Sequence, residues 1–551
     1  MLPYCSNLIV FFGVLFATAY ADEPTKNKKP NILLVLADDV GTGDIPSYWD
    51  SSVVDMPNID RLAKMGVTFK DAHSTPLCAP SRYMLLSGNY AHRGFRPNGS
   101  WGFYEDRNQF LDHQTSIAEV LRDAGYHTGI FGKWHLGAKA PPNGVPRDKD
   151  IKVFEKLLSS PEIDWSLPLI EGPADIGFDR SYITTSGIQA PPYSFFRDGY
   201  LTTNTTDVRF WDRGAYSMPH GMSKIQKHPG EGDKDWDSSA YNMILVNETT
   251  KFIDEHLDEN LSQPFFAYVA LGAVHIPHSP PYRYLDGSRV RKEYPTRHLD
   301  MLFEMDKVAG SLISMIEEKQ LGDDTIIIFT SDNGGLRNNS QKTGHRISGP
   351  LRGEKGMIYE GGHRVPLIMR YDNHFPANET REELVGLNDI YATICELIGV
   401  DIPYRSAQDS ISFADYVDPS ISEGPRIRRT NIATWVNTNN RVKQESIRFG
   451  SFKLIHNAHD ATFELYDLEN DISETNNLSW NEEYAVMIDD MYTKLKADGP
   501  CPDDLEGKFP IEGMNNPKGC RWFRNDTNRC KRHLEGELYC HSVCGHNQQL
   551  C

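Results

Sequence analysis

The first part of the chain alternates short apolar runs with longer stretches that carry apolar residues at helical spacing. NILLVLADD (residues 31–39) predicts a buried strand ending in two aspartates, and PFFAYVALGAVHIPH (264–278) predicts a second strand ending in polar residues. LDMLFEMDKVAGSLISMIEEKQLGDDTIIIFTSDNGG (299–335) predicts an amphipathic helix, a polar turn and a third strand. This alternation is typical of an α/β fold with a mainly parallel sheet.

The segment SIAEVLRDAGYHTGIFGKWHLG (116–137) predicts a helix, a turn and a fourth strand. Ser116 and Glu119 form a capping box at the start of this helix, and Gly125 stands where the helix is expected to stop. The strand that follows ends near Lys133 and His135.

The chain changes in character beyond about residue 432. SIRFGSFKLIH (446–456) and FELYDLENDISETNNL (463–478) predict short antiparallel strands joined by turns, and therefore a small second domain. The predicted division is a signal peptide over residues 1–21, an α/β domain over 22–430, a small α+β domain over 431–500 and a cysteine-rich tail over 501–551.

Composition and charge limit which classes of partner the chain can have. Its 551 residues are 39% hydrophobic and 11% aromatic, as in globular proteins, and this length favours more than one domain. The formal net charge of -19 argues against nucleic acid or an anionic membrane as the main partner. It does not exclude an anionic substrate, because a small pocket can be basic on an acidic surface.

Several features indicate an exported chain. The apolar run Leu8–Ala19, followed by Tyr20 and Ala21, predicts a signal peptide, although no lysine or arginine precedes the run. No later stretch is apolar enough to cross a bilayer, so we expect a mature chain that begins near Asp22. Eight sequons for N-glycosylation favour a secreted or lysosomal glycoprotein: Asn98, Asn204, Asn247, Asn260, Asn338, Asn378, Asn477 and Asn525.

The nine cysteines comprise three isolated ones and a group of six near the end of the chain. Cys5 lies in the predicted signal peptide, and Cys395 lies in an apolar helical pattern that predicts a buried free thiol. Cys78 has no evident partner. The other six crowd the tail, where an even set predicts up to three disulfides: Cys501, Cys520, Cys530, Cys540, Cys544 and Cys551.

Reactive polar residues follow four of the predicted strands: Asp38-Asp39, Lys133 with His135, His275, and Asp332-Asn333. Each alone reads equally well as a strand cap or a turn. Ligands of open α/β sheets, however, bind beyond the carboxyl ends of the strands, so the four together predict one shared site. Three carboxylates and an amide oxygen are hard ligands, suited to Ca²⁺ or Mg²⁺ rather than to Zn²⁺.

Cys78 stands in PLCAPSRYMLLSG (76–88), just before a predicted helix whose first turn accommodates Pro80. The free N–H groups at such a helix start favour a negatively charged ligand. A plain thiol is a poor partner for a hard cation. The pattern therefore indicates that this side chain is chemically altered.

The same stretch resembles the sulfatase family, whose Cys-x-Pro-Ser-Arg motif directs conversion of the cysteine to Cα-formylglycine during export. The motif is matched by Cys78, Pro80, Ser81 and Arg82. One departure is Ser87, where the family usually has threonine. The second family motif is matched by GYHTGIFGKWH (125–135), and further similar stretches are NILLVLADD (31–39), SDNGG (331–335), LRGEKG (351–356) and LYDLENDISETNNL (465–478).

The resemblance implies a fold and an activity. The fold is an alkaline-phosphatase-like α/β/α sandwich, with a smaller C-terminal antiparallel sheet packed beside it. The activity is that of a sulfuric-ester hydrolase of the arylsulfatase type, acting on sulfated sugars or on other alkyl and aryl sulfates. The implied partners are the sulfated substrate and a formylglycine-generating enzyme during export.

The resemblance also implies how the metal and the nucleophile are held. Formylglycine at Cys78 would hydrate to a gem-diol that supplies an oxygen to the metal and a nucleophile to sulfur, with Arg82 orienting it. The metal, Ca²⁺ in preference to Mg²⁺, would be bound by residue 78 together with Asp38, Asp39, Asp332 and Asn333.

The remaining roles concern charge and protons. Lys133 and Lys355 would clamp sulfate oxygens, His275 would protonate the leaving alcohol, and His135 would take a proton from the diol. Two alternatives stay open, because Lys355 also reads as a solvated surface lysine and His278 competes with His275. Four further residues have no assigned role, namely Trp101, Tyr104, His345 and His363.

Two other functions compete with this interpretation. A phosphohydrolase on the same scaffold would normally use serine or threonine with a two-zinc cluster, and Cys78 and Asn333 speak against it. The other is a catalytically inactive glycoprotein that keeps the sulfatase fold and binds sulfated polysaccharide. The presence of every expected catalytic residue makes this alternative less favoured.

Overall fold

The computed structural model describes residues 29–95, 107–143, 156–259, 262–421, 426–438 and 441–498. Several expectations lie outside these residues: the signal peptide, the cysteine-rich tail, Trp101, Tyr104 and three of the sequons.

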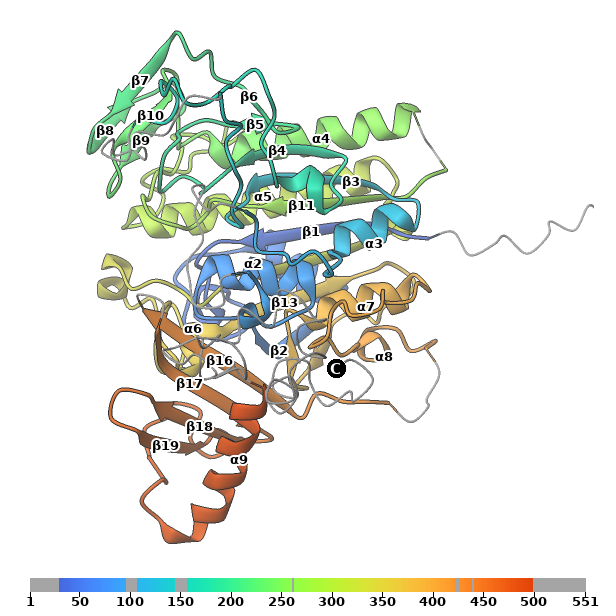
Figure 1. Cartoon of the computed structure of the whole chain (residues 1–551), viewed down its shortest axis with the longest axis vertical. Coiled ribbons are helices and arrows are strands. Elements are labelled where there is room, and N and C mark those ends of the chain that lie inside the picture. The colour runs from blue at the N-terminus through green and yellow to red at the C-terminus, as the bar shows by residue number, and fades with distance from the viewer. Residues whose placement is uncertain are drawn as a thin grey trace, which may run out of the picture.

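An 11-stranded sheet forms the centre of the larger part of the molecule (Figure 1). Its middle strands run parallel, whereas antiparallel pairs occur toward both edges. The strands, in spatial order, are β14 (Glu379–Arg381), β2 (Val67–His73), β13 (Arg364–Arg370), β12 (Thr325–Ser331), β1 (Asn31–Ala37), β11 (Phe265–Ala270), β3 (His127–Lys133), β4 (Arg180–Thr184), β5 (Phe196–Arg197) and β6 (Tyr200–Leu201), with β15 (Val385–Gly386) beside β2.

Strand β1 shows why the sheet is covered on both faces. Its seven residues are all buried, and successive side chains point to opposite sides. Ile32, Leu34 and Leu36 enter one apolar core, and Leu33, Val35 and Ala37 enter the other.

Helices cover the two faces of this sheet. The first core contains residues of α2 (Cys78–Ser87), α3 (Ile117–Asp123), α7 (Asp389–Leu397) and α8 (Ala414–Val417). The second contains residues of α1 (Pro57–Met65), α4 (Tyr241–Glu259) and α5 (Arg297–Glu318). The predicted α/β/α sandwich is therefore confirmed, as is the capping box of Ser116 and Glu119 at the start of α3.

Smaller elements complete the large part. Two short antiparallel pairs precede α4, β7 (Val208–Trp211) with β10 (Gly230–Asp233), and β8 (Gly214–Ser217) with β9 (Met222–Ile225). The remaining short elements of this part are α6 (Glu360–His363), η1 (Thr42–Asp44), η2 (Ala91–Arg93), η3 (Pro173–Ile176), η4 (Gly322–Asp324) and η5 (Asn339–Thr343), whereas η6 (Glu482–Tyr484) lies in the C-terminal part.

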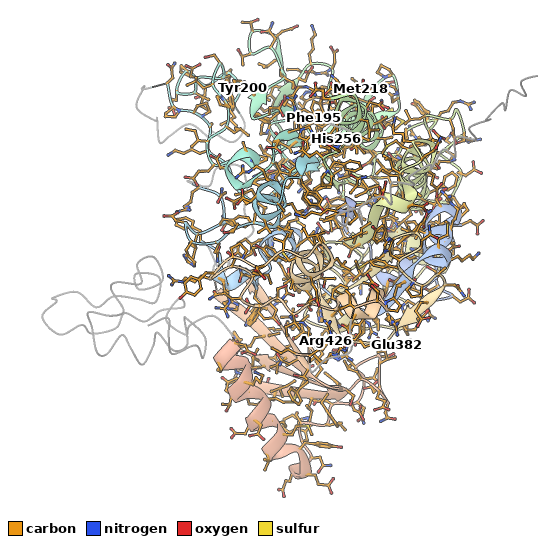
Figure 2. The ribbon with its side chains drawn as sticks, turned by 90° about the vertical axis from the view of Figure 1, so that its right-hand side faces the viewer. Phe195, Tyr200, Met218, His256, Glu382 and Arg426 are labelled. Carbon is orange, nitrogen blue, oxygen red and sulfur yellow. The ribbon has the colours of Figure 1, made fainter. Side chains whose placement is uncertain are left out.

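A separate four-stranded antiparallel sheet lies at the C-terminal end of the described chain, at the bottom of Figures 1 and 2. Its apolar residues, including Leu454, Leu465 and Leu495, pack with Met84 of α2 and with Tyr90. The predicted smaller antiparallel domain is therefore confirmed, while its boundary at residue 431 stays a prediction. The elements are β16 (Asn431–Thr438), β17 (Arg441–Phe449), β18 (Phe452–Asn457), β19 (Thr462–Asp467) and α9 (Ala485–Asp498).

A buried lysine joins this sheet to the large part. The Lys453 side chain is 1% exposed and lies between two carboxylates, 3.0 Å from Glu360 Oε1 and 2.9 Å from Glu474 Oε1. The Lys453 ammonium therefore offsets the repulsion between two carboxylates that water cannot reach.

Replacing Lys453 by methionine tests this junction. We expect the free energy of unfolding to fall by about 3–5 kcal/mol, because Glu360 and Glu474 would be left buried without their cation. Urea unfolding measures the change. The exposed Lys443 of β17 offers a matched control, and equal unfolding midpoints for Lys453→Met and Lys443→Met would contradict the expectation.

Candidate active site

The candidate site lies where the carboxyl ends of β1 and β12 meet. These strands pair in parallel register from Asn31 opposite Thr325 to Ala37 opposite Ser331. Asp38 and Asp332 therefore emerge side by side, and Asp39 and Asn333 follow them. All four side chains are fully buried.

The chain turns sharply at Asp39, whose φ of 65° lies in the left-handed region. Aspartate tolerates this conformation better than most residues do. The turn aims the Asp39 backbone N–H at Asp332, and it donates to Oδ1 at 3.1 Å. The turn thus locks the two strand ends together.

Two buried cations contact these carboxylates. Arg82, on α2, donates from Nε and Nη2 to Asp332 Oδ2 at 3.1 and 2.7 Å, and from Nη1 to the Lys133 carbonyl oxygen at 2.9 Å. Lys133, at the end of β3, donates to Asp38 Oδ2 at 2.7 Å. Such pairs make the burial of several charges tolerable.

Lys355 and His275 both contact Asp39. Lys355 donates to Asp39 Oδ1, and its side chain is only 12% exposed, so it is not a solvated surface lysine. Burial lowers the pKa of Lys355, but the negative charge of Asp39 more than reverses this effect. His275 Nε2 lies 3.7 Å from Asp39 Oδ2.

The oxygen atoms of this site suit a hard divalent cation. Three buried atoms have no hydrogen-bond partner among the described residues: Asp38 Oδ1, Asp39 Oδ2 and Asn333 Oδ1. The Asn333 amide is oriented by its Nδ2, which donates to Asp39 Oδ1 at 2.9 Å. Burial and the negative charge of Asp38 raise the pKa of Asp332 to about 6. Repulsion of this kind is relieved when a cation binds between carboxylates.

Cys78 belongs to the same cluster. It is the first residue of α2, rather than preceding the helix as its sequence suggested. Its Sγ lies 3.3 Å from His135 Nδ1, and the ligand atoms of Asp38, Cys78 and Asp332 all lie within 4.8 Å of one another. Burial raises the pKa of the Cys78 thiol. In this position the thiol stays protonated, which makes it a poor nucleophile and a poor ligand for a hard cation.

His135 is held as a neutral ring. Burial, together with the positive charges of Lys133 and Arg82, keeps the pKa of His135 well below its usual value. A neutral imidazole beside residue 78 has one nitrogen free to accept a proton.

The other histidines singled out from the sequence lie elsewhere. His345 Nε2 contacts Asp44 Oδ1 at 2.7 Å, and Asp44 Oδ2 accepts from the Gly41 N–H at 2.8 Å. This pair holds the loop that follows the two aspartates. His363 faces His73 and Lys453 at the junction with the second sheet.

Two residues beside the site were missed from the sequence. Asp44 supports the loop after Asp39, and His298 is buried next to His278 and His345. The sequence did not reveal them, because the His345 partner of Asp44 is remote in the chain and the burial of His298 depends on the tertiary fold.

Comparisons with known proteins agree with this geometry. The profile of the sulfatase family matches residues 30–161 and 192–400, and a profile described as N-sulphoglucosamine sulphohydrolase, C-terminal, matches residues 353–499. The chain is 27% identical to a sulfatase of Formosa agariphila over 89% of this chain and 92% of that protein. It is 28% identical to an N-acetylgalactosamine-6-O-sulfatase of Bacteroides thetaiotaomicron over 83% of this chain and 91% of that protein.

A solved structure from work on the metabolism of multiple glycosaminoglycans by Bacteroides thetaiotaomicron superimposes on this chain with a TM-score of 0.70. It is 26% identical and covers 85% of this chain and 99% of its own. The fold and the site thus define a sulfuric-ester hydrolase. The chain belongs to the sulfatase family, whose profile matches more than half of its residues. Among the described residues, no helix is both long and apolar enough to cross a membrane.

Replacing Arg82 by lysine keeps one positive charge but removes the planar fork that bonds Asp332 and the Lys133 carbonyl. We expect the free energy of unfolding to fall by about 3 kcal/mol, because the buried Oδ2 of Asp332 loses paired hydrogen bonds from the guanidinium. Urea unfolding with chelator present measures the loss. Arg122→Lys, at an exposed position of α3, should change stability by less than about 0.5 kcal/mol. Equal losses in the two variants would show that the fork is dispensable.

Proposed function

We propose that this chain hydrolyses sulfate esters of glycosaminoglycan-type sugars, using Ca²⁺ and a Cα-formylglycine made from Cys78. The observation that carries the proposal is the set of buried, unpartnered oxygen atoms of Asp38, Asp39 and Asn333 beside the Cys78 side chain. The relatives named N-acetylgalactosamine-6-sulfatase make a 6-sulfated N-acetylgalactosamine the first substrate to test.

The metal would be held by Asp38, Asp39, Asp332 and Asn333, together with an oxygen at residue 78. We favour Ca²⁺ because it accepts many oxygen ligands in irregular geometry, whereas Mg²⁺ usually keeps several waters. When bound, the cation supplies positive charge that polarises the sulfate oxygens.

Modification of Cys78 resolves the mismatch between a protonated thiol and this oxygen-rich set. A hydrated aldehyde at that position supplies an oxygen nucleophile and a hard ligand. Arg82 orients the residue-78 side of the site, because its guanidinium is fixed by Asp332 and by the Lys133 carbonyl. Making the aldehyde requires a formylglycine-generating enzyme, which we expect the chain to meet during export.

Two lysines stabilise the charge that builds up on the transferred sulfate. Lys133 donates to Asp38 and Lys355 donates to the adjacent Asp39, so both ammonium groups lie beside the cluster at which the sulfate would bind. Preorganised cations in a buried site lower the barrier without further reorganisation.

Two histidines move protons. His135 Nδ1, 3.3 Å from the side-chain atom of residue 78, is placed to accept a proton from that side chain. His275 would donate a proton to the leaving alcohol from Nε2. Because its Nδ1–H is already donated to the Ile276 carbonyl oxygen, this step requires the imidazolium form, with the second proton on Nε2 beside Asp39. We assign this role to His275 rather than to His278, because His275 contacts Asp39 and His278 lines an outer cavity.

We further propose that the chain is exported as a glycoprotein and acts in lysosomes or outside the cell. The alternative function, an inactive glycoprotein that binds sulfated polysaccharide, predicts binding without sulfate release. The test below separates the two.

Sulfate release from a panel of sulfated sugars tests the proposal. Wild-type chain, expressed with a formylglycine-generating enzyme, should release inorganic sulfate from 6-sulfated N-acetylgalactosamine at acidic or neutral pH. Cys78→Ala should lower kcat at least about 10⁴-fold, as loss of a nucleophile does in other enzymes, with its melting temperature unchanged. Cys395→Ala removes the other buried free thiol and should keep its activity. Absence of release from every sulfated sugar, with binding retained, would favour the inactive glycoprotein.

Thermal unfolding tests the cation site without any turnover. After chelation, saturating Ca²⁺ should raise the melting temperature, because binding at about 100 times Kd stabilises the folded state by roughly 2.7 kcal/mol. Asp38→Asn should lose this increase, and Asp123→Asn, at an exposed position of α3, should retain it. A Ca²⁺ response that survives in Asp38→Asn would place the cation elsewhere.

A further inference from the structure

A cavity lies beside the candidate site, at the N-terminal end of α5. Its volume is about 870 Å³. Four groups of residues form its walls: from β8 and β9, from the segment after β11, from the start of α5, and from the loop after β12. The lining includes Lys224, His278, Arg297, His298 and Arg337, and also Asn338 of a sequon, which must be unglycosylated for a ligand to enter.

The walls of this cavity continue the segments that build the candidate site. Ile276 lines it and directly follows His275, whose Nδ1 donates to the Ile276 carbonyl oxygen at 2.5 Å. Arg337 follows Asn333 closely in the chain and donates to Glu354, the neighbour of Lys355, at 2.8 Å. A sugar chain bound with one sulfate in the candidate site would therefore extend into this cavity.

His298 is the most informative residue of the lining. Its side chain is 2% exposed, yet neither Nδ1 nor Nε2 has a hydrogen-bond partner among the described residues. A buried polar group without a partner costs free energy that a bound ligand would recover. His298 is therefore a donor or acceptor that has no partner within the described fold.

The group formed by Asp44, His298 and His345 is not a metal site. Although Asp44, His298 and His345 lie close together, His345 is already committed at both ring nitrogens. Its Nε2 contacts Asp44 and its Nδ1 accepts from the Val53 N–H at 3.3 Å. A neutral ring that accepts at Nδ1 carries its proton on Nε2, so it has no lone pair left for a cation.

The charges of the lining instead favour an anion. Lys224, Arg297 and Arg337 are cationic, and no aspartate or glutamate is among the lining residues. Arg337 is partly neutralised by Glu354, whereas Arg297 forms no ion pair within the described residues. The cavity also faces the start of a 22-residue helix, whose first N–H groups favour negative charge.

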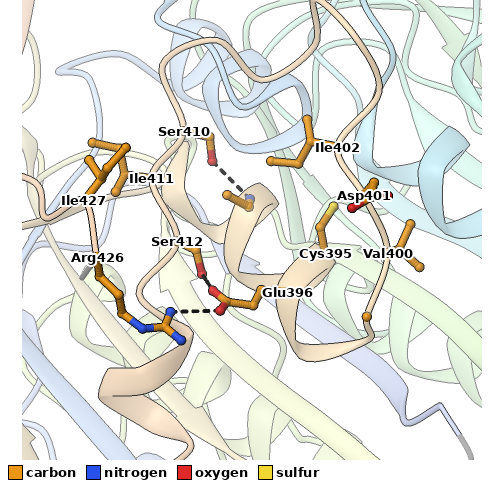
Figure 3. A pocket seen from close by; sticks show the side chains of 12 residues that line it. Cys395, Glu396, Val400, Asp401, Ile402, Ser410, Ile411, Ser412, Arg426 and Ile427 are labelled. Carbon is orange, nitrogen blue, oxygen red and sulfur yellow. Dashed lines mark hydrogen bonds and ion pairs between the residues drawn. The ribbon is translucent and has the colours of Figure 1, made fainter. Parts of the chain in front are cut away.

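A cavity by itself would not indicate an anion site. Another cavity of the molecule, in which the charges are paired, shows this. That cavity, beside α7, has a volume of about 730 Å³ (Figure 3). There Arg426 donates to Glu396 at 2.8 Å, so the guanidinium and the carboxylate neutralise each other. What distinguishes the cavity at α5 is a buried donor without a partner beside a cation without a counter-ion.

We propose that the cavity at α5 binds a second anionic group of the substrate, the carboxylate or sulfate of the sugar next to the one whose ester is cleaved. This inference rests on the proposed function and narrows it to polyanionic saccharides. A chain with a net charge of -19 repels polyanions at long range, so recognition would depend on these local cations.

Matched substrates test the inference. Four are compared: 6-sulfated N-acetylgalactosamine alone, and the same sugar linked to galactose, to glucuronate, or to a sulfated galactose. Wild-type kcat/KM should be higher for the two disaccharides with a charged neighbour than for the one with neutral galactose. Whether the carboxylate or the added sulfate gives the larger gain identifies the preferred anion.

Arg297→Gln should reduce that preference about tenfold, because a charge-assisted hydrogen bond is lost. Lys224→Gln should act in the same direction. The control is Lys227→Gln. It also removes one positive charge, but at an exposed position just after β9 that is outside the cavity lining, so the preference for a charged neighbouring sugar should be kept. No preference in wild type, no loss in Arg297→Gln, or an equal loss in Lys227→Gln would each overturn the inference.

Calorimetry separates this inference from the proposed function. The glucuronate disaccharide is titrated into full-length Cys78→Ala, with and without Arg297→Gln. Weaker binding in the double variant, together with no hydrolysis by wild type, would support the cavity and refute the hydrolase. Hydrolysis by wild type with equal binding in both variants would support the hydrolase and refute the cavity.

Discussion

Mutual repulsion among three buried carboxylates is the interaction on which the rest of this site depends. Asp38, Asp39 and Asp332 are fully buried at neighbouring strand ends, where like charges strongly oppose folding. The sheet brings them together because β1 and β12 pair in parallel register. Arg82, Lys133 and Lys355 each contact one of these carboxylates, and the oxygen atoms left over point to a divalent cation.

The same constraint supports the proposed modification of Cys78. An oxygen-lined, cation-binding cluster gains little from a protonated sulfur, whereas an oxygen at that position completes the set. Charge pairing also separates the candidate site from the cavity at α5. In the proposed function, Lys133 and Lys355, which pair with carboxylates, would bind the reacting sulfate. Arg297, which forms no ion pair within the described residues, would bind the neighbouring sugar.

Much of the fold and part of the site could be predicted from local patterns. Buried strands ending in polar residues located Asp38 and Asp332, and the capping box located the start of α3. Cys395 was correctly predicted as a buried free thiol, because it lies in a mainly apolar helical pattern. These features depend on neighbours in the sequence, which is why patterns reveal them.

The rest depends on contacts between residues far apart in the chain. His345 bonds Asp44 across 301 positions, and the burial of Lys355 reflects Asp39, 316 positions away. The sequence around His298 gave no indication of its role. That role rests on its burial without a hydrogen-bond partner among the described residues, which only the structure reveals.

The mass of the tryptic peptide of residues 71–82, from chain that has passed through the secretory pathway, tests the central claim most directly. The account predicts that the sulfur of Cys78 has been replaced by an aldehyde oxygen. An intact cysteine thiol in protein that releases sulfate would contradict it.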